Sequence, residues 1–188
     1  MCSYMILFPL TICIDALQHN FPGCIGVSNF TIQHLETLQK TATLWPPAVN
    51  QVECHPYYPQ NDLLEYCQKE GIILQAYSSL GGQDWTKVKL KALGGKLLET
   101  EPVLKAAGRL SKTTRVTPAQ VLLRWAIQRN CMIIPKTKTP DRMVENADVF
   151  DFTLTDTEMR EISNLVPRTE SEGRLCWRTE PLRMLDFP

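Results

Sequence analysis

The sequence lacks a net charge, a long hydrophobic run and a paired-cysteine motif, and each absence excludes a class of protein. Its 20 lysines and arginines are balanced by 20 aspartates and glutamates, and the sequence pI is about 6.8. A neutral chain gives no support to general binding of nucleic acid or of a membrane surface. Its 188 residues are 44% hydrophobic and 21% charged, which is enough apolar material for a globular core.

Seven cysteines are present, but none forms a Cys-x-x-Cys pair and their spacing fits no zinc site. We therefore expect no metal centre, and reduced thiols in a cytoplasmic protein. The apolar run at residues 5–14 has no basic residues before it and ends at Asp15. It is too short to span a bilayer and does not look like a signal peptide, so we expect neither a membrane anchor nor secretion.

Short apolar segments alternate with amphipathic segments from about residue 24 onward. The expected strands are 24–27, 48–54, 72–77 and 131–135, and the last two are expected to be buried. The expected helices are 31–44, 61–70, 101–110, 117–129, 139–147 and 155–165, and a glycine-bearing loop is expected at 79–98. Apolar helix faces are expected at Leu63, Leu64 and Cys67 and at Val121, Leu122, Trp125 and Ala126. Gly71 is a fitting helix stop, and Thr155-x-x-Glu158 is a capping-box signature. Such alternation predicts an α/β fold with about four parallel strands and right-handed crossovers. A full (β/α)8 barrel needs roughly 250 residues, so four units correspond to half of one.

The segment Ile133–Asn146 carries the clearest sign of a ligand site. An apolar strand ends at Lys136, and a helix is expected to open at Thr139-Pro140. The first N–H groups of a helix have no partner within the helix and add positive potential. Lys138 and Arg142 add further positive charge, so the loop predicts a site for a phosphorylated ligand. On its own, such a cluster is also typical of a solvated helix start.

Four short motifs occur in order, each at the carboxyl end of an expected strand. They are Gly26-Val27-Ser28-Asn29-Phe30, Val49-Asn50-Gln51-Val52-Glu53-Cys54-His55-Pro56-Tyr57, Ala76-Tyr77-Ser78-Ser79-Leu80-Gly81, and Ile134-Pro135-Lys136-Thr137 followed by Arg142, Glu145 and Asn146. The series resembles the aldo-keto reductases, in their aldose-reductase-like branch, over about residues 24–166. The resemblance implies the C-terminal half of a (β/α)8 TIM barrel. It also implies reduction of small-molecule aldehydes and ketones to alcohols by hydride transfer from NADPH.

The resemblance also implies which residues bind NADPH. Ser28, Asn29 and Gln51 match the side chains that hydrogen-bond the nicotinamide carboxamide, and Tyr77 matches the aromatic that stacks on its ring. The other matching positions are Ser78 and Leu80 along the pyrophosphate, Lys136, Thr137 and Arg142 at the adenosine 2′-phosphate, and Glu145 and Asn146 at the adenine edge. Gly82 departs from the pattern, because many relatives have a serine there.

No catalytic residue is predicted within this chain. The resemblance implies a tetrad of aspartate, tyrosine, lysine and histidine, all located before the Gly-Val-Ser-Asn-Phe strand. The residues that precede Gly26 include Tyr4, Asp15 and His19 but no lysine, and they match none of the tetrad motifs. His34 and His55 match ordinary non-catalytic positions. The general acid that protonates the carbonyl oxygen is therefore expected to be absent.

The expected organisation is a divergent segment at 1–23, a partial reductase barrel at 24–166 and a divergent tail at 167–188. We interpret the first segment as the product of an alternative transcript start, an exon change or an imperfect gene model. Three hypotheses follow: a truncated reductase chain that keeps its cofactor half, a non-catalytic module that forms a homodimer through exposed barrel edges, and an unstable, inactive fragment.

Overall fold

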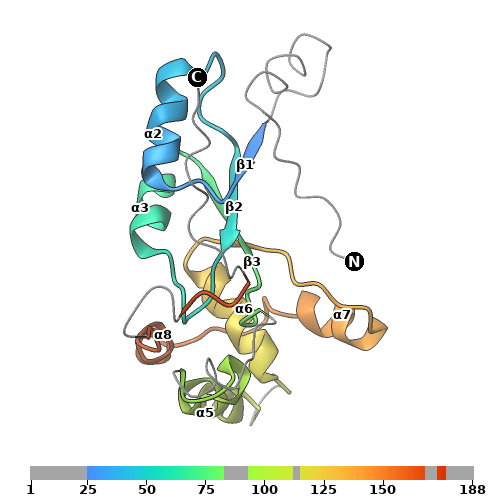
Figure 1. The fold of residues 1–188 in the computed structure, drawn as a ribbon. Coiled ribbons are helices and arrows are strands. Elements are labelled where there is room, and N and C mark those ends of the chain that lie inside the picture. Colours follow the sequence, from blue (N-terminus) through green and yellow to red (C-terminus); the bar gives the residue numbers. More distant parts are fainter. Residues whose placement is uncertain (1–24, 83–92, 112–114, 168–172, 177–188) are drawn as a thin grey trace. The chain divides into compact units, whose positions relative to one another are not determined.

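The computed structural model describes residues 25–82, 93–111, 115–167 and 173–176 (Figure 1). Four strands, β1 (Gly26–Ser28), β2 (Val49–Glu53), β3 (Ile73–Tyr77) and β4 (Met132–Ile133), follow one another in that order in one sheet. β1 and β2 pair in parallel, with Gly26 opposite Val49. The predicted α/β fold with four parallel strands and flanking helices is confirmed. The expected segment 1–23 lies outside the described residues, as does most of the tail.

Six α-helices and one short 3₁₀ helix occur in the described part of the chain. They are α2 (Ile32–Thr41), α3 (Asn61–Lys69), η1 (Leu97–Glu99), α5 (Glu101–Leu110), α6 (Pro118–Gln128), α7 (Pro140–Ala147) and α8 (Asp156–Ser163). All six predicted helices are present. The first ends at Thr41 rather than at residue 44, and η1 lies where only a loop was expected.

The described residues form two compact units. The first contains β1, α2, α3 and most of β2 and β3, and Figure 1 shows both helices on the same side of these strands. α2 begins at a capping box in which the Thr31 hydroxyl accepts from the His34 N–H and His34 Nδ1 accepts from the Thr31 N–H. α3 presents the predicted buried face of Leu63, Leu64 and Cys67. His34 is thus a capping residue of α2.

The second unit is built around α6. All four residues of the predicted apolar face of α6 are fully buried, namely Val121, Leu122, Trp125 and Ala126. α6 contacts α5, α7 and β4, and α5 contacts α8. The indole Nε1 of Trp125 donates to the Ser163 hydroxyl at the end of α8, at 2.9 Å. This central helix therefore holds α7, and with it the lysine-bearing loop, in place.

Two strands are less buried than the sequence predicts. The segment 131–135 was expected to be a buried strand, but Met132 and Ile134 are 42% and 38% exposed. β4 is the last strand in the sheet order of the described residues, so it has a neighbouring strand on one side. In β3, Leu74 and Ala76 are buried while Ile73 is 45% exposed, which is the alternation of a strand with one covered face.

We expect the carboxylate of Glu158 to make folding sensitive to acid. Burial favours the neutral form, but hydrogen bonds from Arg109 and Thr155 outweigh it and hold the pKa of Glu158 below its usual value. Because the folded-state pKa is lowered, this stabilisation is present at neutral pH and is lost as the pH falls through the acidic range. Glu158→Gln should shrink the difference in unfolding free energy between pH 7 and pH 3 by about 1 kcal/mol in urea titrations. Glu65 is exposed, and an equal reduction of this pH-dependent difference by Glu65→Gln would contradict the prediction.

Candidate functional site

The residues that follow β1 and β3 adopt an unusual backbone conformation. Asn29 has φ +59° and Ser78 has φ +55°, in the left-handed region that side chains other than glycine seldom occupy. Strain of this kind is often retained at functional sites, where it directs a side chain that the regular strand would point elsewhere. Both positions belong to the predicted cofactor set.

The first unit brings three of the predicted cofactor residues together. The Ser28 hydroxyl donates to the Gln51 carbonyl at 3.0 Å, and the Asn29 N–H donates to the same oxygen at 2.9 Å. Nδ2 of Asn29 lies 3.3 Å from the Ser28 hydroxyl oxygen. Nε2 of Gln51 donates to Gln75 at 2.6 Å, which fixes the orientation of its amide. A hydroxyl and two carboxamides are thereby held at one edge of the sheet.

Asn50 is a residue of this site that sequence reasoning missed. Its fully buried side chain accepts from the Phe30 N–H at 3.3 Å and donates to the Phe30 carbonyl at 2.9 Å. These two bonds tie down the turn that carries Asn29. The sequence offered one sign of this role, namely a polar residue at a buried position of an apolar strand. Buried polar side chains are almost always hydrogen-bonded, so such a residue indicates a structural contact.

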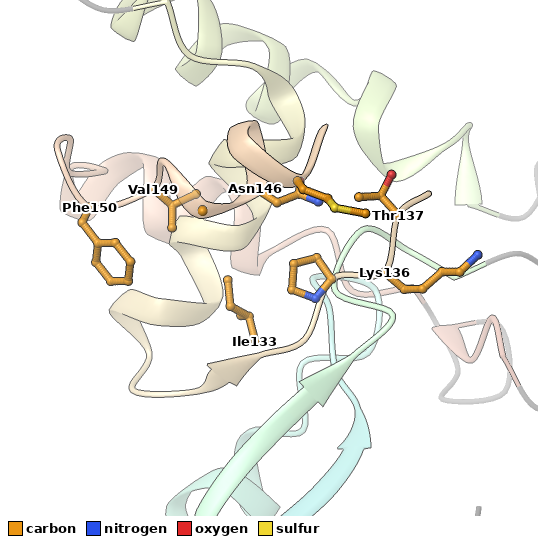
Figure 2. Close-up of a pocket in the computed structure, with 9 residues that line it drawn as sticks. Ile133, Lys136, Thr137, Asn146, Val149 and Phe150 are labelled. Carbon is orange, nitrogen blue, oxygen red and sulfur yellow. The ribbon is translucent and has the colours of Figure 1, made fainter. Parts of the chain in front are cut away.

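The second unit contains a hollow of about 640 Å³ between β4 and α7. Its lining is mostly apolar and consists of Ile133, Pro135, Lys136, Thr137, Met143, Asn146, Ala147, Val149 and Phe150. Figure 2 shows Ile133, Val149 and Phe150 toward one end, and Thr137 and Lys136 at the other. Three of the predicted cofactor residues, Lys136, Thr137 and Asn146, therefore line one hollow.

The other two predicted residues of α7 lie differently. Arg142 is solvent-exposed in the first turn of α7, and it is not among the residues that line the hollow. Glu145 Oε1 accepts from the Thr117 hydroxyl at 2.6 Å. That hydroxyl also accepts from the Gln120 N–H at the start of α6, so Glu145 joins α7 to the cap of α6. Its predicted adenine contact has to coexist with this bond.

The remaining predicted residues lie at and after the end of β3. Tyr77, Ser78 and Leu80 are all partly exposed, and the Tyr77 carbonyl accepts from the Cys54 N–H at 3.2 Å. The Ser78 hydroxyl is 2.6 Å from the thiol of Cys176. The loop that is predicted to meet a pyrophosphate is thus in contact with the C-terminal segment.

Tyr57 and His55 are both buried and hydrogen-bonded. Burial raises the pKa of Tyr57 to about 12, and its hydroxyl donates to the carbonyls of Leu93 and Gly95. His55 is fully buried, and its Nε2 lies 3.0 Å from Glu53. No group of three or more potential metal ligands occurs among the described residues, and no described helix is long and apolar enough to cross a bilayer.

Comparison with known proteins identifies the family. The family model described as "Aldo/keto reductase family" matches residues 23–167. The chain belongs to the aldo/keto reductase family. The residue range of the match contains every one of the predicted cofactor residues. The recognition made from the four motifs is therefore confirmed.

Individual relatives support the same assignment. The chain is 43% identical to an aldo-keto reductase family 1 member A1 of Gallus gallus over 151 residues, which cover 79% of this chain and 43% of that protein. It is 43% identical to a probable NAD(P)H-dependent D-xylose reductase of Arthroderma otae, over 75% of this chain and 42% of that protein. This chain thus spans about half the length of these relatives.

A solved structure shows the same half-length relationship. An aldo-keto reductase from a Medee basin deep-sea metagenome library superposes with a TM-score of 0.71 at 34% identity. The match covers 91% of this chain and 56% of that one. The fold of this family member thus corresponds to about half of a reductase barrel.

Proposed function

We propose that this aldo/keto reductase chain binds NADP(H) and contributes the cofactor half of a site that reduces small-molecule aldehydes or ketones. The main support for the proposal is the hollow between β4 and α7, because Lys136, Thr137 and Asn146 all line it. When bound, the dinucleotide would supply the hydride. The four described cysteines are thiols rather than disulfides, which supports a reducing, cytoplasmic location.

The hollow fits the adenosine end of the cofactor. Its apolar walls suit a flat base, and the Asn146 amide offers a donor and an acceptor to the base edge. Lys136 lies at one end of the hollow, and the start of α7 follows in the chain. A 2′-phosphate held there by Lys136, Thr137 and Arg142 would distinguish NADPH from NADH.

The cluster in the first unit fits the nicotinamide carboxamide. Ser28 and Asn29 are held by the Gln51 carbonyl, and Asn50 fixes the turn that carries Asn29. A carboxamide needs both donors and acceptors, which the hydroxyl and the two side-chain amides supply. Such prior ordering reduces the cost of binding. Tyr77, at the end of β3, would stack on the ring and select the face that offers its hydride.

Hydrogen–deuterium exchange with and without NADPH tests this assignment. Protection is expected in peptides that cover residues 25–30 and 133–147, and no change is expected in α3, which carries no proposed contact. Binding without protection at 133–147 would place the dinucleotide elsewhere. NADPH binding without protection at 25–30 would contradict the assignment of Ser28 and Asn29 to the nicotinamide carboxamide.

We predict that the purified chain alone does not reduce an aldehyde. Tyr57 and His55 are buried and hydrogen-bonded, and the 188 residues contain none of the family's catalytic-tetrad motifs. Consumption of NADPH with 4-nitrobenzaldehyde, followed at 340 nm, should equal the blank. Turnover above the blank that is abolished by Arg142→Ala would contradict the prediction.

A second candidate function is an interaction module. Met132 and Ile134 around β4, together with Met143 and Val144 of α7, are exposed apolar side chains close to the last strand of the sheet. Such a surface and strand favour pairing, here with a second copy of the chain. A folded monomer in sedimentation at micromolar concentration would exclude the homodimer.

A further inference from the structure

The buried carboxylate of Glu53 is bound from three directions. Glu53 is 4% exposed, and its Oε1 lies 3.0 Å from Nε2 of His55. The same oxygen accepts from the N–H groups of Leu175 at 2.6 Å and Cys176 at 3.1 Å. Two successive backbone N–H groups that converge on one oxygen form an anion-binding nest. Glu53 thus anchors a segment that lies 122 residues further along the chain.

The histidine completes this arrangement. Nδ1 of His55 is buried and has no hydrogen-bond partner among the described residues. A bare ring nitrogen tolerates this better than an N–H group does, so the proton belongs on Nε2, which donates to Glu53. The carboxylate therefore has at least three donors among the described residues, which offset the cost of burying its charge.

The anchored segment lies on the loop that follows β3. The thiol of Cys176 is 2.6 Å from the Ser78 hydroxyl. A side chain on Gly82, which has φ +64°, would come within 3.0 Å of both Cys176 Sγ and Leu175 Cβ. Glycine at this position, where the family resemblance suggests a serine, therefore leaves room for the segment. Arg174 adds a bond to the Tyr58 hydroxyl at 2.8 Å.

We propose that Glu53 is a positioning residue that holds Gly173–Cys176 as a cover over Ser78 and Gly82, and that this cover competes with a dinucleotide pyrophosphate for that loop. The inference rests on the proposed function, because Ser78 is a predicted pyrophosphate contact. A ligand oxygen that approaches the Ser78 hydroxyl meets the Cys176 thiol, which already contacts it. The bound cover thus lowers the fraction of molecules that are competent to bind.

The test compares wild type, Glu53→Gln and the exposed control Glu101→Gln as full-length chains, with circular dichroism to confirm folding. Loss of the carboxylate should speed hydrogen exchange of the peptide at 173–176 at least about tenfold and lower the NADPH Kd by about threefold to tenfold. The control should change neither quantity. Cys176→Ala, at an exposed position, removes the contact with Ser78 without disturbing the core, and should lower the Kd in the same direction.

The outcomes separate two kinds of failure. Faster exchange with tighter NADPH binding supports the cover. Unchanged exchange in a folded Glu53→Gln protein, or faster exchange with unchanged or weaker NADPH binding, overturns it while the proposed function stands. If Glu53→Gln does not fold, an unchanged Kd in Cys176→Ala overturns the cover. If no variant binds NADPH even after the segment is released, the proposed function fails, and the competition fails with it.

Discussion

Replacing Lys136 or Arg142 with alanine is expected to weaken NADPH binding by about tenfold to a hundredfold each. Hydrogen bonds to charged groups contribute about 1.5–3 kcal/mol, and 1.4 kcal/mol corresponds to a factor of ten in affinity. Lys136 lines the hollow between β4 and α7, and Arg142 lies in the first turn of α7. Arginine offers a planar fork that matches two phosphate oxygens, whereas lysine acts as a point charge.

The effect should be specific to the 2′-phosphate. NADH lacks this group, so its Kd should change by less than about threefold in the same variants, in keeping with screened interactions at exposed sites. Arg160 is an exposed residue of α8, so Arg160→Ala removes the same charge from another helix and serves as the control. Calorimetric titrations with both dinucleotides provide the measurement. Equal weakening of NADPH and NADH binding would show that Lys136 and Arg142 do not recognise the 2′-phosphate.

Trp125→Ala should produce the largest loss of stability among single substitutions. Trp125 is fully buried in α6, its indole donates to Ser163, and the Arg129 guanidinium lies 4.3 Å from its ring centroid. Removal of a buried tryptophan costs about 3–5 kcal/mol, against a total of about 5–15 kcal/mol for a typical domain. The free energy of unfolding from urea titration should fall by that amount.

An exposed aromatic provides the matched control for this prediction. Phe150 is 69% exposed, so Phe150→Ala should change the free energy of unfolding by less than about 0.5 kcal/mol. A Trp125→Ala protein as stable as wild type would mean that α6 is not the centre of its unit. A loss confined to Trp125→Ala supports the packing of α5, α7 and α8 around α6.

Local sequence signals predicted most of the helices and strands. One helix start is predicted by Thr117-Pro118, and another by the pair Thr155 and Glu158. Thr117 and Thr155 each form a capping box in the structure. Gly71, with φ +73°, follows the end of α3 at its predicted place. Each signal depends on neighbours within a few residues along the chain, so it can be read without knowledge of the fold.

Features that depend on distant contacts were not predictable in the same way. The expected buried strand at 131–135 is partly exposed because its burial depends on what lies beside it in the sheet, not on its own apolar residues. The anchoring of Leu175 and Cys176 by Glu53 joins residues more than 120 positions apart. The motifs named the candidate cofactor residues, but the bonds that hold Asn29 and Glu145 became visible only in the structure.

Titration of the intact chain with NADPH, followed by quenching of tyrosine and tryptophan emission, tests the central claim most directly. Arg142→Ala serves as the paired sample, because Arg142 is exposed and its loss should leave the fold unchanged. The account predicts saturable quenching in the wild type and its loss, or a shift to at least about tenfold higher NADPH concentration, in the variant. Absence of saturable quenching in the folded wild type, or identical curves for the two proteins, would contradict it.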